Sequence, residues 1–261
     1  VLYRDGQGVT QDYGKARAWY EKAAAQDDAQ AQYNLGVLYY EGKGVAQDYG
    51  KAREWWEKAA TQGYAEAQYN LGFMYAGGRG VAKDLLKARK WFEKAAAQGF
   101  VEAQTNLGVM YYRGRGGAQD YAKAREWWEK AAAQGNAQAQ YHLGLIYADG
   151  DGVPQDYAQA AAWFEKAATQ GIVQAQQNLG AFYAKGEGVP LDTTKAHQWF
   201  EKAAAQGYAK AQYNLGNFYS DGRGVPQDFA KAREWYEKAA AQTDDKEIQQ
   251  AAQQALQKIS Q

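Results

Sequence analysis

One position of this sequence carries an amide side chain at a constant spacing of 36 residues. The series is Asn34, Asn70, Asn106, His142, Asn178 and Asn214, in which one histidine replaces the amide. An asparagine side chain donates hydrogen bonds to carbonyls and accepts them from amides, so such a row suits the backbone of an extended peptide. The alternative is that each amide bonds to a neighbouring part of the same chain. The residues themselves leave both interpretations open.

Five further positions close to the amide row differ from copy to copy. Their series begin at Gln30, Tyr33, Val37, Tyr40 and Glu41. On a helix these spacings form one stripe, and residues that only stack have no reason to vary along it. The variation favours a surface shaped for a ligand, with drift on an unselected face as the alternative. Aromatic members would supply anchors of the kind that dominate binding energy. They are Tyr33, Tyr40, Tyr69, Phe73, Tyr112, Tyr141 and Tyr213.

Residue types that catalyse reactions or bind metals do not gather anywhere in the sequence. His142 and His197 are the only histidines, they fall on different predicted helices, and cysteine is absent. Their spacing fits neither a zinc site nor a catalytic triad. Asp149 and Asp151 begin like a calcium loop, but Val153 stands at a ligand position. We therefore expect no catalytic residue, no metal site and no cofactor, and predict that the protein is not an enzyme.

Charge and composition narrow the range of partners. The 261 residues include 30 Lys and Arg against 30 Asp and Glu, and 46% are hydrophobic, which is enough to bury a large core. Without an excess of cations we expect no nucleic-acid partner, and without a run of roughly 18–20 apolar residues we expect no membrane insertion. Arg79, Arg113 and Arg115 form a small basic group in the middle loops, either solvated or facing an acidic partner segment.

The elements that position these residues follow from the internal repeat. Leu-Gly recurs every 36 residues from Leu35-Gly36 to Leu215-Gly216. Each copy contains two helical stretches, of which the first ends at paired glycines such as Gly42 and Gly44. The second follows an aspartate suited to cap a helix, at Asp12, Asp48, Asp84, Asp120, Asp156, Asp192 and Asp228. In five copies it ends at a glycine, namely Gly63, Gly99, Gly135, Gly171 and Gly207. The repeated unit is predicted to be a helix hairpin.

The apolar positions indicate that the hairpins stack. Leu35, Leu38 and Tyr39 lie on one face of the first helix, and Trp55 and Trp56 lie on one face of the second. We expect the glycine of Leu-Gly to let neighbouring backbones approach. The tryptophan at Trp19, Trp55, Trp91, Trp127, Trp163, Trp199 and Trp235 should fill the space between hairpins and be hidden by stacking.

The last segment differs from the repeats. Ile248, Ala252 and Ile259 fall on one helical face, while Gln250 and Gln253 fall on the other. A polar outer face is typical of the helix that closes a repeat array. We therefore divide the chain into a repeat array over 1–242, whose first unit begins in the middle of a hairpin, and a capping helix within 243–261 of the same domain.

The unit resembles the Sel1-like repeat, a relative of the tetratricopeptide repeat. The matching elements are A-x-A-Q-x-x-L-G, the loop G-x-G-V, the capping Asp and K-A-x-x-W-x-x-K-A-A; Gly117 departs from the pattern by replacing the loop Val. The resemblance implies an all-α, right-handed superhelical solenoid that acts as an adaptor or ligand-binding scaffold. It also implies that the variable stripe lines the concave side, where related tetratricopeptide grooves use an Asn of the first helix.

The expected function is therefore a protein-protein interaction scaffold that binds a peptide or partner protein in its concave groove. One alternative is a module for a glycan or small molecule, such as a cell-wall fragment, because tyrosines and amides also suit sugars. Another is an engineered, consensus-like repeat protein without a native ligand. The sequence fixes neither the oligomeric state nor the compartment, with a periplasmic or secreted bacterial location slightly favoured.

Overall fold

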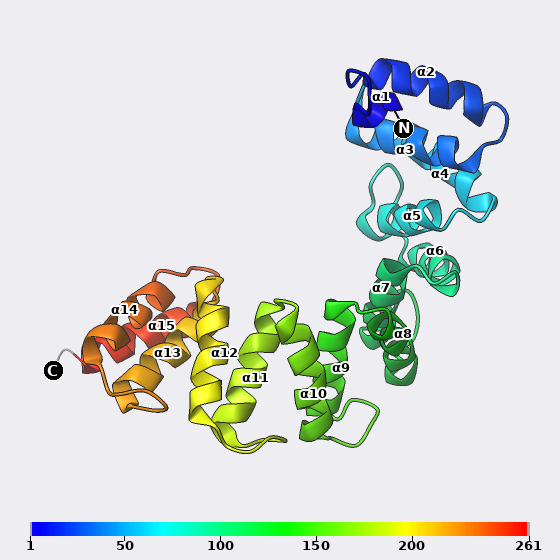
Figure 1. The fold of residues 1–261 in the computed structure, drawn as a ribbon. Coiled ribbons are helices and arrows are strands. Elements are labelled where there is room, and N and C mark those ends of the chain that lie inside the picture. Colours follow the sequence, from blue (N-terminus) through cyan, green and yellow to red (C-terminus); the bar gives the residue numbers. More distant parts are fainter. Residues whose placement is uncertain (1, 260–261) are drawn as a thin grey trace. The chain divides into compact units, whose positions relative to one another are not determined.

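The computed structural model describes residues 2–259, is entirely helical in its regular elements over that range, and separates into two units (Figure 1). Residues 1–134 form the first unit, with α1 (Leu2–Asp5), α2 (Tyr13–Ala24), α3 (Ala29–Glu41), α4 (Tyr49–Thr61), α5 (Ala65–Gly77), α6 (Leu85–Ala97), α7 (Val101–Tyr112) and α8 (Tyr121–Ala133). Residues 135–261 form the second unit, with α9 (Ala137–Asp149), α10 (Tyr157–Thr169), α11 (Val173–Lys185), α12 (Thr193–Ala205), α13 (Ala209–Asp221), α14 (Phe229–Ala240) and α15 (Lys246–Lys258). The all-α prediction is confirmed.

Consecutive helices pack as stacked hairpins inside each unit. In the first unit, α3 packs with α4, α5 with α6 and α7 with α8, while α4 also contacts α5 and α6 contacts α7. The second unit repeats the arrangement from α9 to α14. Each unit is thus a stretch of α/α solenoid, and within a unit each hairpin packs against the next, as the 36-residue period predicts.

The helix ends form where the sequence places them. Each of the seven repeated aspartates accepts a hydrogen bond at 2.8–3.0 Å from the backbone N–H three residues later, as Asp48 does from Lys51. At the opposite ends, Gly42 and Gly63 have φ angles of 71° and 90°. A left-handed backbone of this kind favours glycine, so these residues end the helices without strain.

The glycine of each Leu-Gly makes room for a buried ring of the second helix. A Cβ at Gly36 would lie 2.3 Å from the indole of Trp56, which is almost fully buried. The same pairing joins Gly72 to Phe92, Gly108 to Trp128, Gly144 to Phe164, Gly180 to Phe200 and Gly216 to Tyr236. The expected approach of a neighbouring backbone occurs at Gly180, whose Cβ position lies 3.3 Å from the carbonyl oxygen of Ala196, but the nearest neighbour of each glycine is a ring. The partner of this glycine is an aromatic side chain of its own hairpin.

The tryptophan one position earlier is only partly covered. Trp55 packs against the core of the preceding hairpin, but it and its counterparts are half-buried, and Trp19 is 60% exposed. In every copy the lysine three residues later places its Nζ 4.0–4.8 Å from the ring centroid. A lysine stem and ammonium cover the outer face of an indole while remaining in water. Stacking therefore hides only one face of these rings, which corrects the expectation from sequence.

A buried glutamine links three helices in each of several repeats. The Nε2 of Gln68 on α5 donates to the carbonyl of Ala60 on α4 at 3.1 Å. The Oε1 of Gln68 accepts from Nε2 of Gln98, just beyond α6, at 2.8 Å. Gln104 and Gln176 make the same two kinds of bond. This glutamine thus gives a helix-terminal carbonyl a second hydrogen bond, beside the one from the backbone N–H of the glycine three residues later.

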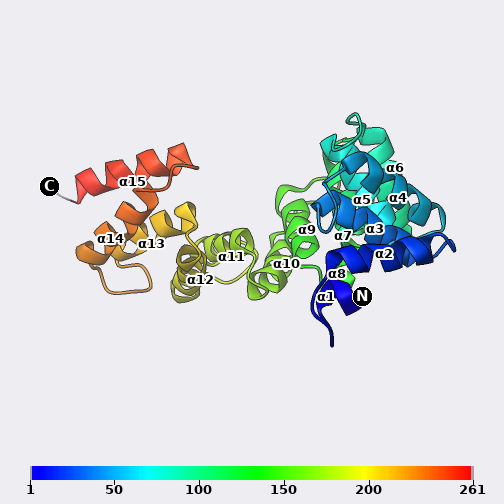
Figure 2. The same ribbon diagram turned by 90° about the horizontal axis from the view of Figure 1, so that it is seen from above.

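The C-terminal helix α15 packs on α13 and α14 and covers the last hairpin (Figure 2). Asp245 caps it by accepting a hydrogen bond from the backbone of Ile248 at 3.1 Å. Ala252 is fully buried, whereas Gln250 and Gln253 are exposed. The predicted capping helix is confirmed within residues 246–258; residue 1 and residues 260–261 lie outside the described part of the chain.

Candidate ligand-binding groove

The predicted site residues all lie on the first helices of the repeats. In the first unit they are Tyr33, Asn34 and Tyr40 on α3, Tyr69, Asn70 and Phe73 on α5, and Asn106 and Tyr112 on α7. In the second unit they are Tyr141 and His142 on α9, Asn178 on α11, and Tyr213 and Asn214 on α13. Asn34 is buried, Phe73 is exposed, and the others are half-buried.

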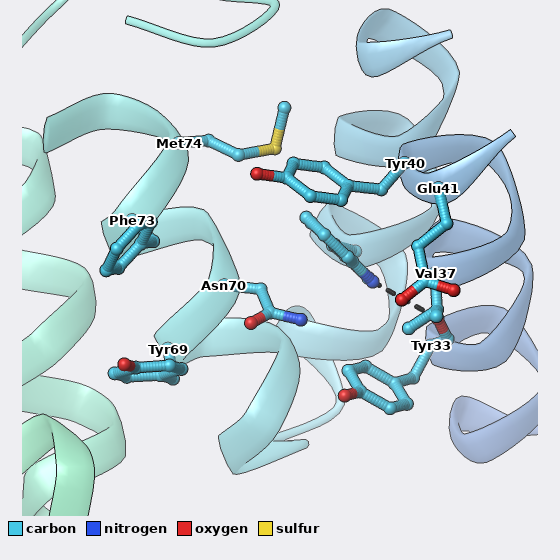
Figure 3. Close-up of a pocket in the computed structure, with 9 residues that line it drawn as sticks. Tyr33, Val37, Tyr40, Glu41, Tyr69, Asn70, Phe73 and Met74 are labelled. Atoms are coloured by element: carbon cyan, nitrogen blue, oxygen red, sulfur yellow. Dashed lines mark hydrogen bonds between the residues drawn. The ribbon is translucent and has the colours of Figure 1, made fainter. Parts of the chain in front are cut away.

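Five of these residues meet at a cavity of about 300 Å³ between α3 and α5 (Figure 3). Its lining residues are Tyr33, Val37, Tyr40, Glu41, Trp56, Tyr69, Asn70, Phe73 and Met74. Figure 3 shows the amide of Asn70 pointing from α5 toward Tyr33 and Val37 on α3. The amide row and the variable stripe therefore come together here, as the sequence predicts for one face of the first helices.

Aromatic packing fixes the wall of this first cavity. The indole Nε1 of Trp56 donates to the carbonyl of Tyr33 at 3.1 Å, the bond drawn as a dashed line in Figure 3. The ring of Tyr40 lies 5.3 Å from that of Trp56 and 5.1 Å from that of Tyr49, centroid to centroid. Rings held at such distances by several neighbours have few alternative rotamers, so the cavity is preformed.

A second cavity of about 350 Å³ lies next to the first, between α5 and α7. Its lining residues are Phe73, Ala76, Lys83, Leu85, Phe92, Asn106, Val109, Met110 and Arg115. Phe73 is shared by both cavities and is 48% exposed. The two cavities form what we call the groove, which runs across the first helices of three successive repeats.

The second cavity exists because an aromatic pair is missing from the repeat at 65–100. In the preceding repeat the rings of Tyr40 and Tyr49 lie 5.1 Å apart, and an equivalent tyrosine pair in the following repeat lies 5.2 Å apart. Ala76 and Leu85 occupy the corresponding positions in the repeat between them. Two smaller side chains replace two rings, and the space that the rings would fill stays open.

Besides Asn70, which hydrogen-bonds with the hydroxyl of Tyr33, two further members of the amide row bond to other parts of the first unit. Asn34 accepts a hydrogen bond from Nη1 of Arg4 at 2.8 Å. Nδ2 of Asn106 donates to the hydroxyl of Tyr69 in the preceding repeat at 3.3 Å. The interpretation that these amides bond within the chain is confirmed at both positions. Asn106 also lines the second cavity, and its contact with a ligand stays a prediction.

The hydroxyls of Tyr33, Tyr69 and Tyr141 remain protonated at neutral pH. Burial raises the pKa of Tyr33 and of Tyr141, and hydrogen bonding with Asn70 and Asn178, respectively, opposes that shift. Because the ordinary pKa of tyrosine is about 10, a raised value keeps the group neutral. Each hydroxyl can therefore donate one hydrogen bond and accept others, which suits recognition of a peptide.

Several predicted residues serve the core as much as a surface. The ring of Tyr112 lies 5.6 Å from Trp128, that of Tyr141 lies 5.8 Å from Phe164, and Tyr213 lies 5.8 Å from Tyr236. His142 lies beside the ring of Tyr141 at 5.7 Å. The residues that line the two cavities all belong to the first unit.

Sequence reasoning missed the residues that form the floor of the groove. Trp56, Met74, Phe92 and Met110 are buried core residues, and they also line the two cavities. The change from a tyrosine pair to Ala76 and Leu85 was visible in the aligned copies. What the sequence does not show is that both positions border the same cavity.

Within residues 2–259, no three His, Cys, Asp or Glu residues lie close enough together to hold a metal ion. His142 on α9 and His197 on α12 belong to different hairpins. Among the helices described for this range, none has both the length and the apolar character needed to cross a membrane.

The stacked hairpins, the repeated Leu-Gly and the groove on the first helices define an α/α repeat scaffold. The Sel1 repeat model matches residues 1–28, 29–64, 65–100, 101–136, 137–172, 173–208 and 209–244. The chain therefore belongs to the Sel1 repeat family, and the resemblance stated from its sequence is confirmed. This family is a non-catalytic type of repeat scaffold, and its fold commonly mediates protein interactions.

Two solved structures are closely similar. One is a protective antigen of uropathogenic Escherichia coli strains with an SLR fold, at 41% identity and a TM-score of 0.89, over 92% of this chain and 51% of the antigen. The chain thus spans about half the length of that antigen. The other is a Sel1 repeat protein from Oxalobacter formigenes, at 33% identity and a TM-score of 0.78, over 94% and 95% of the two chains. The comparison with curated proteins gave no match.

Proposed function

We propose that this chain is a protein-binding scaffold and that the groove of its first unit receives an extended peptide segment of a partner. The observation that carries the proposal is Phe73, a large apolar side chain that is 48% exposed between two adjoining cavities. A preformed apolar groove with a few polar groups is the usual form of a ligand site. Its aromatic rings would supply the anchoring contacts.

The polar groups of the groove support a peptide as the ligand. The amides of Asn70 and Asn106 lie in successive repeats and each lines one of the two cavities. An amide that both donates and accepts pairs well with the alternating carbonyl and N–H groups of an extended backbone. The hydroxyls of Tyr33 and Tyr69 lie beside them and add further donors and acceptors.

The proposal is tested by selecting binders to the full chain from a random peptide library and measuring their affinity for two variants. Asn70→Ala combined with Asn106→Ala should weaken binding and leave the thermal unfolding midpoint nearly unchanged. Phe73→Val, which introduces the residue found at Val37 and Val109, should weaken binding by roughly 30-fold, the loss expected for a hot spot of about 2 kcal/mol.

Leu86→Ala provides the matched control, because Leu86 is 54% exposed and lines neither cavity. Equal affinity of the selected peptides for all variants would contradict the use of the groove. A large loss of stability in the double asparagine variant would show that the amide row is structural. A glycan array tests the sugar alternative. That alternative is favoured if the chain binds a glycan, Phe73→Val abolishes this binding, and no library peptide binds.

A further inference from the structure

The loops beside the groove carry cations that lack the acidic partner found in other repeats. In the loop after α3, Nζ of Lys43 pairs with Glu41 at 2.9 Å. In the loop after α5, Arg79 occupies the place of Lys43, and Gly77 stands where Glu41 would be. Over residues 2–259, Arg79 forms no ion pair, and its guanidinium instead donates to the hydroxyl of Tyr40 at the edge of the first cavity.

The next loop increases the charge imbalance. Arg115 occupies the same place after α7, and Arg113 stands two residues before it, where the loop after α13 has Asp221 paired with Arg223 at 3.2 Å. Neither Arg113 nor Arg115 has an ion-pair partner in the described part of the chain, and both are exposed. Two like charges thus stand close together in a loop whose counterpart elsewhere is neutralised.

A fourth cation, Lys83, lines the second cavity and is found at this position in only one repeat. At its position the other first-unit loops have a glutamine that donates to the carbonyl of the preceding helix, as Gln47 does to Tyr40 and Gln119 to Tyr112, at 2.8 and 2.7 Å. Lys83 replaces this glutamine and lines the second cavity together with Arg115. No acidic residue lines that cavity, so its rim is positive and its floor is apolar.

The floor has the size and chemistry for one large side chain. Leu85, Phe92, Val109 and Met110 provide apolar surface, and the volume of about 350 Å³ lies at the lower end of the range of ligand pockets. The space is open because Ala76 and Leu85 replace a tyrosine pair. An apolar anchor would gain burial there, while carboxylates on either side of it would meet unpaired cations.

Resting on the proposed function, we infer that the partner segment is acidic and that it inserts one large apolar side chain into the second cavity. The carboxylates flanking this anchor contact Lys83 and Arg115 at the rim of the cavity, with Arg79 and Arg113 nearby on the same two loops. Because these cations are exposed, the charge contribution is screened by salt and acts strongly on the association rate. The apolar contribution resists salt.

Synthetic peptides test the inference directly on the full chain. The probe is a labelled nine-residue peptide with a blocked C-terminus, a central Phe and two Glu on each side of it. One matched peptide has Lys in place of every Glu, and another has Ala in place of Phe. Fluorescence anisotropy should show the Glu and Phe peptide binding at least about tenfold more tightly than either control, with an affinity that falls as salt rises.

Two double variants separate the anchor from the charges. Ala76→Tyr with Leu85→Tyr restores the aromatic pair of the neighbouring repeats, so this variant should fold normally. Its affinity for the peptide with Glu and Phe should fall to the affinity measured for the peptide with Ala in place of Phe. Lys83→Gln with Arg115→Gln should remove most of the preference for Glu over Lys. Lys90→Gln with Lys210→Gln changes the net charge equally at exposed positions that line neither cavity and should leave the preference intact.

The outcomes separate this inference from the proposed function. If library peptides bind in a Phe73-dependent manner but show no acidic preference, or if Lys83→Gln with Arg115→Gln leaves the preference unchanged, the inference is overturned and the groove remains a peptide site. Binding of the Glu and Phe peptide that persists at full strength in the tyrosine-restored variant overturns the anchor. If neither the designed peptides nor any library peptide depends on Phe73, both proposals fail.

Discussion

Two regions of the molecule are built from the same 36-residue unit, yet they tolerate change differently. One is the interface between the two helices of a hairpin, and the other is the face that carries the groove. At the interface, each Leu-Gly glycine accommodates a ring of the second helix, and the pairing is kept in six hairpins. On the groove face, Tyr40, Ala76 and Tyr112 occupy equivalent positions although their sizes differ greatly.

The difference follows from how many neighbours each position has. A Cβ at Gly108 would lie 2.3 Å from the indole of Trp128, so neither residue can change alone without a clash or a void. Ala76 borders a cavity, and losing a ring there removes little from the core. The repeats can therefore acquire different ligand contacts on one face while the other face keeps them stacked.

The largest loss of stability should come from breaking the interface at its central ring. Trp128→Ala removes a side chain that is only 1% exposed, together with the hydrogen bond from its Nε1 to the carbonyl of Thr105 at 3.1 Å. We expect the free energy of unfolding to fall by about 3–5 kcal/mol, because the space left beside Gly108 cannot collapse. Urea unfolding monitored by circular dichroism measures this loss.

Trp127→Ala is the matched comparison on the same helix. Trp127 is half-buried, and Nζ of Lys130 lies 4.2 Å from its ring centroid, so its truncation should cost roughly half as much or less. Equal losses for the two tryptophans would contradict the distinction between the buried and the partly covered series.

A smaller effect should separate two amides of the same helix. Gln68 on α5 is 5% exposed and bonds both to Ala60 and to Gln98, whereas Asn70 lines the groove. Gln68→Ala should cost about 1–3 kcal/mol because it removes two hydrogen bonds of a buried side chain, each worth roughly 0.5–1.5 kcal/mol. Asn70→Ala should cost clearly less, as judged by the thermal midpoints of the two variants. The reverse order would place the amide row in the structural framework.

The period, the helix ends and the capping helix were predictable because each rests on local chemistry. Asp48 caps its helix through an N–H three residues away, and Gly42 ends one through its own backbone angle. The choice between Trp55 and Trp56 as the core ring was not predictable. Adjacent residues on a helix point about 100° apart, and only the packing of three helices decides which one is buried.

The candidate site was predictable only in part, again because the packing of several helices decides what the sequence pattern leaves open. The variable stripe led to Tyr33, Tyr40 and Phe73, which line the groove. The amide row led to Asn34, which is buried against Arg4, and the stripe also led to residues of the second unit that pack on core rings. Periodicity defines a helical face, but the opening of a cavity on that face depends on side-chain volumes contributed by three different helices.

The smallest expected effect concerns α12, one of the two second helices that lack the arginine of their counterparts. Arg17, Arg53, Arg89 and Arg125 each pair with a glutamate four residues later, at 3.2–3.6 Å. His197 stands at this position on α12, is 8% exposed, and packs edge-on against Tyr219 at 5.3 Å. Its Nε2 finds no hydrogen-bond partner within residues 2–259.

Burial lowers the pKa of His197, and the nearby charge of Lys231 lowers it further, while Glu201 acts in the opposite direction. The folded state therefore disfavours the protonated imidazole. Above the unfolded pKa of about 6.5 both states are neutral and stability is unaffected; as the pH falls below it, the unfolded state binds the proton first and stability declines until the folded pKa is passed. Urea midpoints at about pH 7.5 and about pH 5.5 should show this decline, and His197→Arg should reduce it. His142 is common to both chains and cancels in the difference, so an identical pH dependence in the two would show that His197 is not the group responsible.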